Sequence, residues 1–128
     1  MKLKMMYGLP FIDVVFMHRG KEIIVSSVLV DTGSATTLLS AEIALEFGLE
    51  PELTDKIQAI RGVGGKEFVY EKKIDRLQLG SATAYNFVIQ IGDMDYGLEI
   101  QGIIGTDFLR LAKIVIDMEA SDLYAKNE

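Results

Sequence analysis

The sequence predicts one all-β domain, a mainly antiparallel barrel or sandwich with two short helices. Its 128 residues suit a single hydrophobic core, because two domains of half that length would each be marginally stable. The apolar stretches are short and rich in Val, Ile and Phe, as strands are. They do not alternate regularly with helical segments, as a parallel α/β sheet would require. We therefore expect residues 1–128 to form a single domain.

The N-terminal part of the sequence predicts a hairpin followed by a helix. Residues 11–17 and 22–30 are apolar and largely β-branched, and the polar residues 18–21 between them suit a hairpin turn. A short helix should begin after Ser40, whose hydroxyl can cap it. It should end at Gly48, since glycine suits the position that follows a helix.

The rest of the sequence predicts further strands and a second helix. Residues 56–80 are strand-like on either side of a glycine-rich segment at residues 61–66, so they should form a projecting hairpin. Residues 92–97 are polar and glycine-containing, which indicates a loop. The other expected elements are strands at residues 85–91, 113–118 and 123–124 and a helix that Thr106 caps and that runs to Leu111.

Composition excludes several classes of function. The net charge of −6 gives no general attraction for nucleic acids or anionic membranes. The absence of cysteine excludes disulfides, thiolate metal sites and a cysteine nucleophile, and the single histidine, His18, lies in an expected surface turn. We therefore expect no metal and no cofactor. Because no signal peptide and no stretch of about 18 apolar residues is present, we also expect a cytoplasmic protein.

The most informative motif is Asp31-Thr32-Gly33-Ser34, which directly follows an apolar strand. A strand that ends in a carboxylate, hydroxyls and a glycine places an acid at the mouth of a hydrophobic core. Asp-Thr-Gly alone is a weak signal, because turns favour these residues. Its neighbours in the chain therefore decide how it is interpreted.

With those neighbours, the sequence resembles the retroviral-type, or retropepsin-like, aspartic proteases, which are single-domain chains that dimerise. The likeness covers nearly the whole chain. It implies a retropepsin-like acid protease barrel with a flap hairpin and one or two short helices. Three segments carry it in order: Asp31-Thr32-Gly33-Ser34 as the catalytic loop, Ile60-Arg61-Gly62-Val63-Gly64-Gly65 as the flap tip, and Ile103-Ile104-Gly105-Thr106-Asp107-Phe108-Leu109 near the carboxyl end.

The resemblance implies a role for each residue of the catalytic loop. Asp31 is the catalytic acid, and Thr32 hydrogen-bonds across a twofold axis. Gly33, without a Cβ, lets substrate and partner loop approach closely. The hydroxyl of Ser34 is placed where it can donate to the Asp31 carboxylate. The alternative for Thr32 and Ser34 is a turn that satisfies its own backbone.

The glycine-rich segment would act as a substrate-binding flap. Such a hairpin can close over a bound peptide, exclude water and hydrogen-bond the peptide backbone. The residues assigned to it are Arg61, Gly62, Val63, Gly64 and Gly65. Arg61 departs from viral flaps, which are usually apolar at that place, so it either favours acidic substrate side chains or points outward.

Asp107 follows Gly105 closely and could be mistaken for the second acid, but it is not expected to be catalytic. It lies at a helix start, where a carboxylate can accept hydrogen bonds from backbone amides and complement the helix dipole. Ile103, Ile104 and Gly105 are expected to be structural: the resemblance implies a strand that passes beneath the catalytic loop and a Gly105 that permits close helix packing. We assign all four a supporting role.

These observations predict an aspartic endopeptidase. Aspartic proteolysis needs two carboxylates that share one proton, and Asp31 is the only aspartate followed by Thr-Gly or Ser-Gly, so its partner must be Asp31 of a second copy. The expected partners are a peptide or protein substrate and a second chain in a homodimer. The alternative is a catalytically silent protease-like module for dimerisation or peptide binding. A metal-dependent hydrolase is disfavoured because the nineteen acids are scattered and no set of histidine ligands accompanies them.

Overall fold

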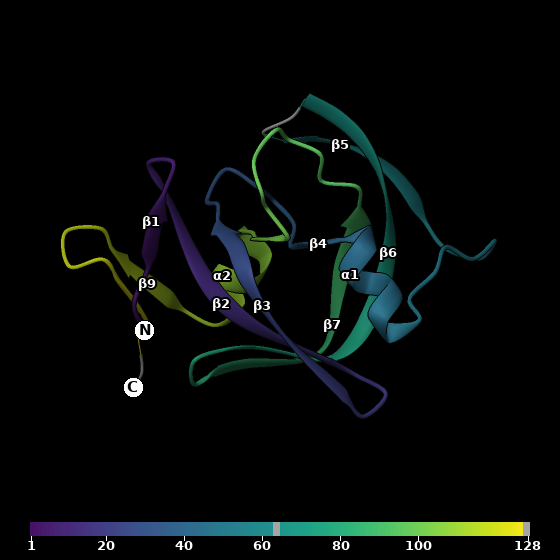
Figure 1. Cartoon of the computed structure of the whole chain (residues 1–128). Coiled ribbons are helices and arrows are strands. Elements are labelled where there is room, and N and C mark those ends of the chain that lie inside the picture. Colours follow the sequence, from purple (N-terminus) through teal and green to yellow (C-terminus); the bar gives the residue numbers. More distant parts are fainter. Residues whose placement is uncertain (63–64, 127–128) are drawn as a thin grey trace.

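The computed structural model describes residues 1–62 and 65–126, and most of them lie in strands (Figure 1). The all-β class predicted from the sequence is confirmed. The strands are β1 Lys4–Met6, β2 Leu9–His18, β3 Lys21–Val30, β4 Leu38–Ser40, β5 Ile57–Gly62, β6 Gly65–Leu79, β7 Ala82–Gly92, β8 Gly102–Ile104, β9 Ile114–Asp117 and β10 Asp122–Ala125. The helices are α1 Ala41–Ala44, the short 3₁₀ helix η1 Leu45–Phe47 and α2 Thr106–Leu111.

The strands close into a ring. Eight of them form one sheet in the order β1-β2-β3-β8-β4-β7-β6-β5. An additional pairing of β2 with β6, the strands next to the two end strands, closes this sheet into a ring. Most pairs are antiparallel, but β8 runs parallel to β3, and β4 runs parallel to β7. The short strand β8 therefore lies between β3 and β4, which places the segments that follow β3 and β8 at the same edge of the sheet.

Local sequence signals explain the turns and the first helix. The β2–β3 hairpin turns through Arg19 and Gly20, whose φ angles of 51° and 78° match the two-residue turns that favour tight hairpins. The hydroxyl of Ser40 accepts a hydrogen bond from the Ile43 amide, and Gly48 ends the helical segment with φ 74°. These predictions are confirmed. The predicted cap at Thr106 is wrong, because Thr106 is the first helical residue of α2 and Gly105 takes the cap position with no side-chain bond.

Two hydrophobic clusters fill the interior. The larger includes Ile12, Phe16, Leu77 and Phe108, with Phe87 packed edge-on against Phe108 at a ring distance of 5.8 Å. The smaller cluster, called the second core below, includes residues near the end of β3, at the start of β4 and in β8. Its buried members are Phe11, Leu29, Leu38, Val69, Met94, Ile100 and Ile103.

The two chain ends meet in a small sheet. Strand β10 pairs with β9 on one side and, through a bridge between Lys2 and Asp122, with the start of the chain on the other. The terminal ammonium group of Met1 lies 2.9 Å from an Asp122 carboxylate oxygen. Figure 1 shows this sheet on one side of the molecule, away from α1.

No helix in the described ranges 1–62 and 65–126 is long and apolar enough to span a bilayer.

Candidate active site

Strand pairing fixes the position of Asp31. The parallel β3–β8 pair ends with Val30 opposite Ile104, and the Asp31 amide donates to the Ile104 carbonyl at 3.0 Å. The Asp31 side chain is half-buried, and its Oδ1 accepts a hydrogen bond of 2.8 Å from the Gly33 amide. A methyl group added at Gly33 would lie 3.2 Å from the same oxygen, so glycine leaves room for this orientation. The carboxylate is therefore held by its own loop.

The hydroxyl of Ser34 has a different partner from the one expected. It donates to the Thr36 carbonyl at 2.7 Å, while the Ser34 amide donates to the Asp31 carbonyl at 3.2 Å. A hydroxyl has one proton to donate, so in this geometry Ser34 does not donate to the Asp31 carboxylate. The expectation of a direct bond to the carboxylate is corrected: Ser34 stabilises the turn, which was the alternative interpretation. Thr32 and Gly33 are both exposed in the single chain.

The Asp31 loop, defined as residues 31–37, passes over the end of β8. It connects β3 to β4, which flank β8, so it must cross the chain at Gly105. The Thr106 amide donates to the Ser34 carbonyl at 2.8 Å. A methyl group added at Gly105 would lie 2.6 Å from the Thr36 carbonyl carbon and 2.8 Å from the Ser34 carbonyl oxygen. Gly105 was expected to permit close packing of a helix, whereas the close contact that it permits is with the backbone of the Asp31 loop.

Asp107 fastens the far end of the Asp31 loop. Its Oδ1 accepts from the hydroxyl of buried Thr37 at 2.7 Å and from the Phe108 amide at 2.8 Å, and its Oδ2 accepts from the Thr37 amide at 3.2 Å. The Thr37 hydroxyl in turn accepts from the Gly105 amide at 3.1 Å. The supporting role expected for Asp107 is confirmed. Thr37 was missed by the sequence analysis, although a hydroxyl immediately before a buried strand is a signal that it needs a partner.

Replacing Thr37 by Val should therefore destabilise the protein by about 2–4 kcal/mol, because a bond to a charged acceptor is lost and the Gly105 amide is left without its partner. Valine keeps the shape of the side chain, so packing is little changed. Urea unfolding of the variant measures the effect. Thr83→Val, at a half-exposed position of β7, is the control and should change the free energy of unfolding by less than about 0.5 kcal/mol. Equal stability of the two variants would contradict this account.

The glycine-rich hairpin is formed by β5 and β6. Backbone pairing places Arg61 opposite Lys66 and Gly62 opposite Gly65, so the hairpin predicted from the sequence is confirmed up to these residues. Val63 and Gly64 lie outside the described residues. Beyond Tyr70, which pairs with Ile91 of β7, the hairpin continues as a two-stranded ribbon of residues 58–62 and 65–69. Figure 1 shows the ribbon reaching the same end of the molecule as the loop after β7.

The base of this ribbon is fastened by a lysine between two acids. The Lys72 ammonium lies 2.6 Å from a Glu52 oxygen and 2.9 Å from an Asp55 oxygen, which ties residues 52–55 to β6. The hydrogen bond from Lys72 is the main cause that lowers the pKa of Asp55. The hydroxyl of Tyr70 donates to the Leu49 carbonyl at 3.0 Å and fastens the same region.

This lysine contact should weaken in acid. Because the folded-state pKa of Asp55 is lowered, its stabilising contribution is present above the unfolded value of about 4 and is lost as the pH falls through the lowered value. Asp55→Asn should therefore destabilise the protein near pH 7 and have little effect near pH 2. Urea unfolding of both proteins at the two pH values measures this. A difference that stays constant with pH would show that the carboxylate charge contributes nothing.

Among the side chains in residues 1–62 and 65–126, no three from His, Asp or Glu gather closely enough to hold a metal ion. The chemistry available at the Asp31 loop is that of a carboxylate held at the edge of a β ring, beside an exposed glycine.

A ring of strands whose Asp-Thr-Gly loop crosses a glycine, together with a long hairpin, is the arrangement of the retropepsin-like folds. A family model described as aspartyl protease matches residues 14–108, so the chain belongs to the aspartyl protease family. The crystal structure of a retropepsin-like aspartic protease from Rickettsia conorii is similar, with a TM-score of 0.60 and 23% sequence identity over 95% of this chain and 82% of that one. None of the curated proteins compared matches the chain.

Proposed function

We propose that this chain is an aspartic endopeptidase that works as a homodimer, with Asp31 of each copy activating one water molecule. The observation that carries the proposal is the Asp31 carboxylate, which its own loop orients at the edge of the ring in a member of the aspartyl protease family. One carboxylate takes a proton from the water as it attacks, and the other, protonated, polarises the peptide carbonyl.

The second carboxylate must come from another copy. Asp107 follows the turn beneath the loop but is already bonded to Thr37 and the Phe108 amide, so it is not free to share a proton with Asp31. A twofold axis beside the Asp31 loop would bring the two Asp31 side chains together, because an isologous contact places a residue near the axis against its own copy. The exposure of Thr32 and Gly33 in the single chain is compatible with such a contact.

The β5–β6 hairpin supports a peptide as the substrate. In this proposal it acts as a flap that closes over an extended peptide, and its residues Arg61, Gly62, Val63, Gly64 and Gly65 contact the peptide backbone. Closure would exclude bulk water from the two carboxylates, which strengthens their interaction with the reacting groups.

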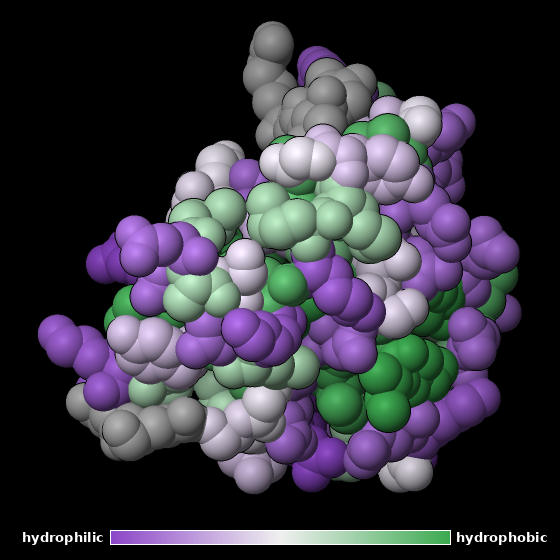
Figure 2. Space-filling model, turned by 60° about the vertical axis from the view of Figure 1, so that its left-hand side comes forward, coloured by the Kyte–Doolittle hydropathy of each residue, from purple (hydrophilic) through white to green (hydrophobic). Residues whose placement is uncertain are grey.

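The dimer should include the side of the molecule that carries the chain ends. In the part of the chain that the structure describes, β9 is an edge of the terminal sheet and offers unpaired backbone groups. Exposed apolar side chains lie nearby, namely Met5, Tyr7, Met118 and Tyr124. Figure 2 is turned toward this side and shows hydrophobic groups interspersed with hydrophilic ones, a mixture typical of interfaces between subunits.

Sedimentation equilibrium should accordingly give a mass of about twice 14.2 kDa at micromolar concentration. Met118→Lys, which places a charge among these side chains, should shift the protein toward the monomer and lower its specific activity in parallel. The control is Tyr85→Lys on β7, where the side chain is 70% exposed and no role at the interface is proposed. A strictly monomeric protein that still cleaves peptides would exclude the shared site.

A diverse peptide library, incubated with the protein from acidic to neutral pH, tests the activity itself. We expect cleavage to be greatest in acid, because the pair must keep one proton. Binding of peptides without any cleavage would favour the alternative of a catalytically silent module.

A further inference from the structure

Tyr96 lies on the extended loop of residues 93–101 that joins β7 to β8. Side chains alternate along this loop, with acids exposed at positions 93, 95 and 99. The side chains between them contribute to the second core or pack against it: Met94, Tyr96, Leu98 and Ile100. Tyr96 is half-buried there, so its ring is anchored while its hydroxyl reaches past the edge of the core.

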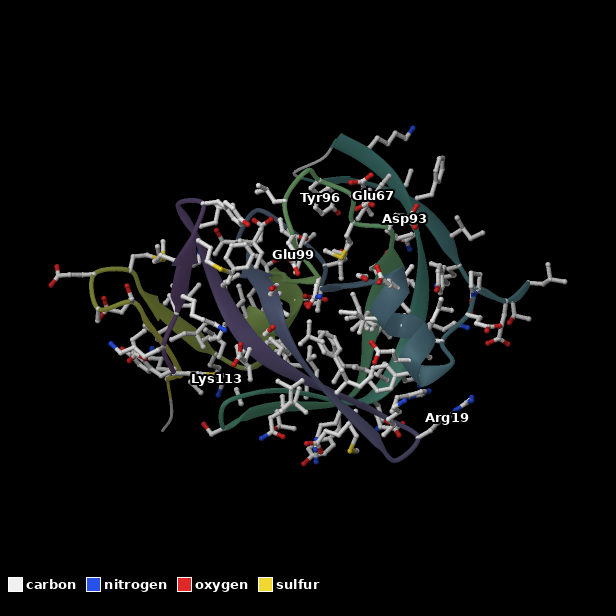
Figure 3. All side chains as sticks on the ribbon, viewed as in Figure 1. Arg19, Glu67, Asp93, Tyr96, Glu99 and Lys113 are labelled. Carbon is white, nitrogen blue, oxygen red and sulfur yellow. The ribbon has the colours of Figure 1, made fainter. Side chains whose placement is uncertain are left out.

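That hydroxyl donates a hydrogen bond to the carboxylate of Glu67 on β6. Figure 3 shows the two side chains pointing toward each other from the loop and from β6. Burial and the neighbouring Glu67 carboxylate raise the pKa of Tyr96, with a further contribution from the negative charge of Asp31. The phenol therefore keeps its proton and remains a donor, and the pair lies within electrostatic reach of the candidate catalytic acid.

Glu67 belongs to the ribbon, which needs support from outside. The β6–β7 ladder ends at the pair of Tyr70 with Ile91, and residues 65–69 then pair only with residues 58–62. A two-stranded ribbon alone is marginally stable in water. The Glu67 carboxylate packs over Gly92, where an added methyl group would lie 3.4 Å from its Oε2 and 3.0 Å from Val69. The absence of a side chain at Gly92 thus leaves room for Glu67 to face Tyr96.

We propose that Tyr96 is a positioning residue. Through its hydrogen bond to Glu67 it holds the ribbon in the position in which the ribbon can bind a peptide over the Asp31 loop. This role rests on the proposed function, because the ribbon is the proposed flap. With the bond in place, the ribbon already occupies the position that binds a peptide in most molecules. Peptide binding then costs less conformational entropy, because less of the ribbon has to be ordered. Tyr96 acts on substrate affinity through the ribbon and leaves the chemistry of the two carboxylates unchanged.

Hydrogen exchange of the backbone amides tests the bond without any substrate. Tyr96→Phe, which removes only the hydroxyl, should reduce protection of amides in residues 58–62 and 65–69 by about tenfold, the effect of losing a bond to a charged acceptor. Glu67→Ala should do the same, and the double variant should be no worse than either single variant. Glu67→Gln, whose amide oxygen still accepts, should largely restore protection. Tyr85→Phe, at an exposed site on β7, is the matched control and should match the wild type.

Kinetics with a cleaved peptide then test the role in substrate binding. Tyr96→Phe should raise KM three- to tenfold and change kcat by less than twofold, because the ribbon is in the peptide-binding position in a smaller fraction of the molecules. A fall in kcat with KM unchanged would overturn the positioning role. Unchanged exchange in Tyr96→Phe, or additive effects in the double variant, would overturn the proposed bond. If the wild type cleaves nothing, the proposed protease activity fails, whereas the exchange results still decide whether Tyr96 fastens the ribbon.

Discussion

Asp31→Asn should abolish peptide cleavage while leaving the fold in place. Asparagine has nearly the same shape as aspartate, and its side-chain oxygen can still accept the hydrogen bond from the Gly33 amide. It can neither take a proton from water nor share one with a partner, and both copies in a homodimer lose this function together. We expect kcat/KM to fall by at least about 10³-fold, within the range that proton-transfer catalysis contributes.

The measurement compares the rate of cleavage of one peptide by the wild type, Asp31→Asn and a control. Asp13→Asn is a suitable control, because Asp13 lies on β2 and forms an exposed ion pair with Lys4. Thermal unfolding should show that Asp31→Asn is at least as stable as the wild type in the dimer, since two neighbouring carboxylates no longer repel each other. Full activity in Asp31→Asn would refute the proposed site.

Among glycines 8–48 and 80–105, the change Gly105→Ala should have the largest effect on stability, because only there would the added methyl group clash with backbone at under 3.0 Å. The added carbon would meet the carbonyl groups of Thr36 and Ser34, which are backbone and cannot rotate away. The Asp31 loop would have to lift from β8, which breaks the bond from the Thr106 amide to Ser34. We expect a loss of more than about 3 kcal/mol, or failure to fold, together with loss of cleavage.

Gly48→Ala separates this clash from ordinary backbone strain. Gly48 has φ 74°, and a methyl group added there meets nothing within 4 Å. The substitution should cost about 1–2 kcal/mol from backbone conformation alone. Soluble expression and urea unfolding of the two variants provide the comparison. A Gly105→Ala protein as stable as Gly48→Ala would show that the loop does not lie against Gly105.

The sequence was sufficient for features that depend on neighbouring residues. Ser40 and Gly48 bound the first helix because a hydroxyl cap and a left-handed glycine act within one turn. Asp31 was found because its motif is contiguous. Glycines on either side of Val63 likewise predicted the hairpin, although its tip lies outside the described residues.

The features that could not be predicted depend on contacts between distant segments. Thr37 and Asp107 are 70 positions apart, and only the placement of β8 between β3 and β4 brings them together. The partner of the Ser34 hydroxyl follows from the three-dimensional path of the loop, because Asp31 and Thr36 are both close to it in sequence. The bond between Tyr96 and Glu67 requires the loop after β7 to fold back on the ribbon, which no local pattern indicates.

The insertion of β8 between β3 and β4 also affects when the site can form during synthesis. The Asp31 loop is held by hydrogen bonds to residues 104–107, so the carboxylate lacks this support until those residues have left the ribosome. A nascent chain is thus expected to remain inactive until these residues have emerged. The same long sequence separations give the fold a high contact order, which places its expected refolding time in milliseconds to seconds. Fragments that end before residue 102 should accumulate unfolded, because β3 and β4 then lack the strand that joins them.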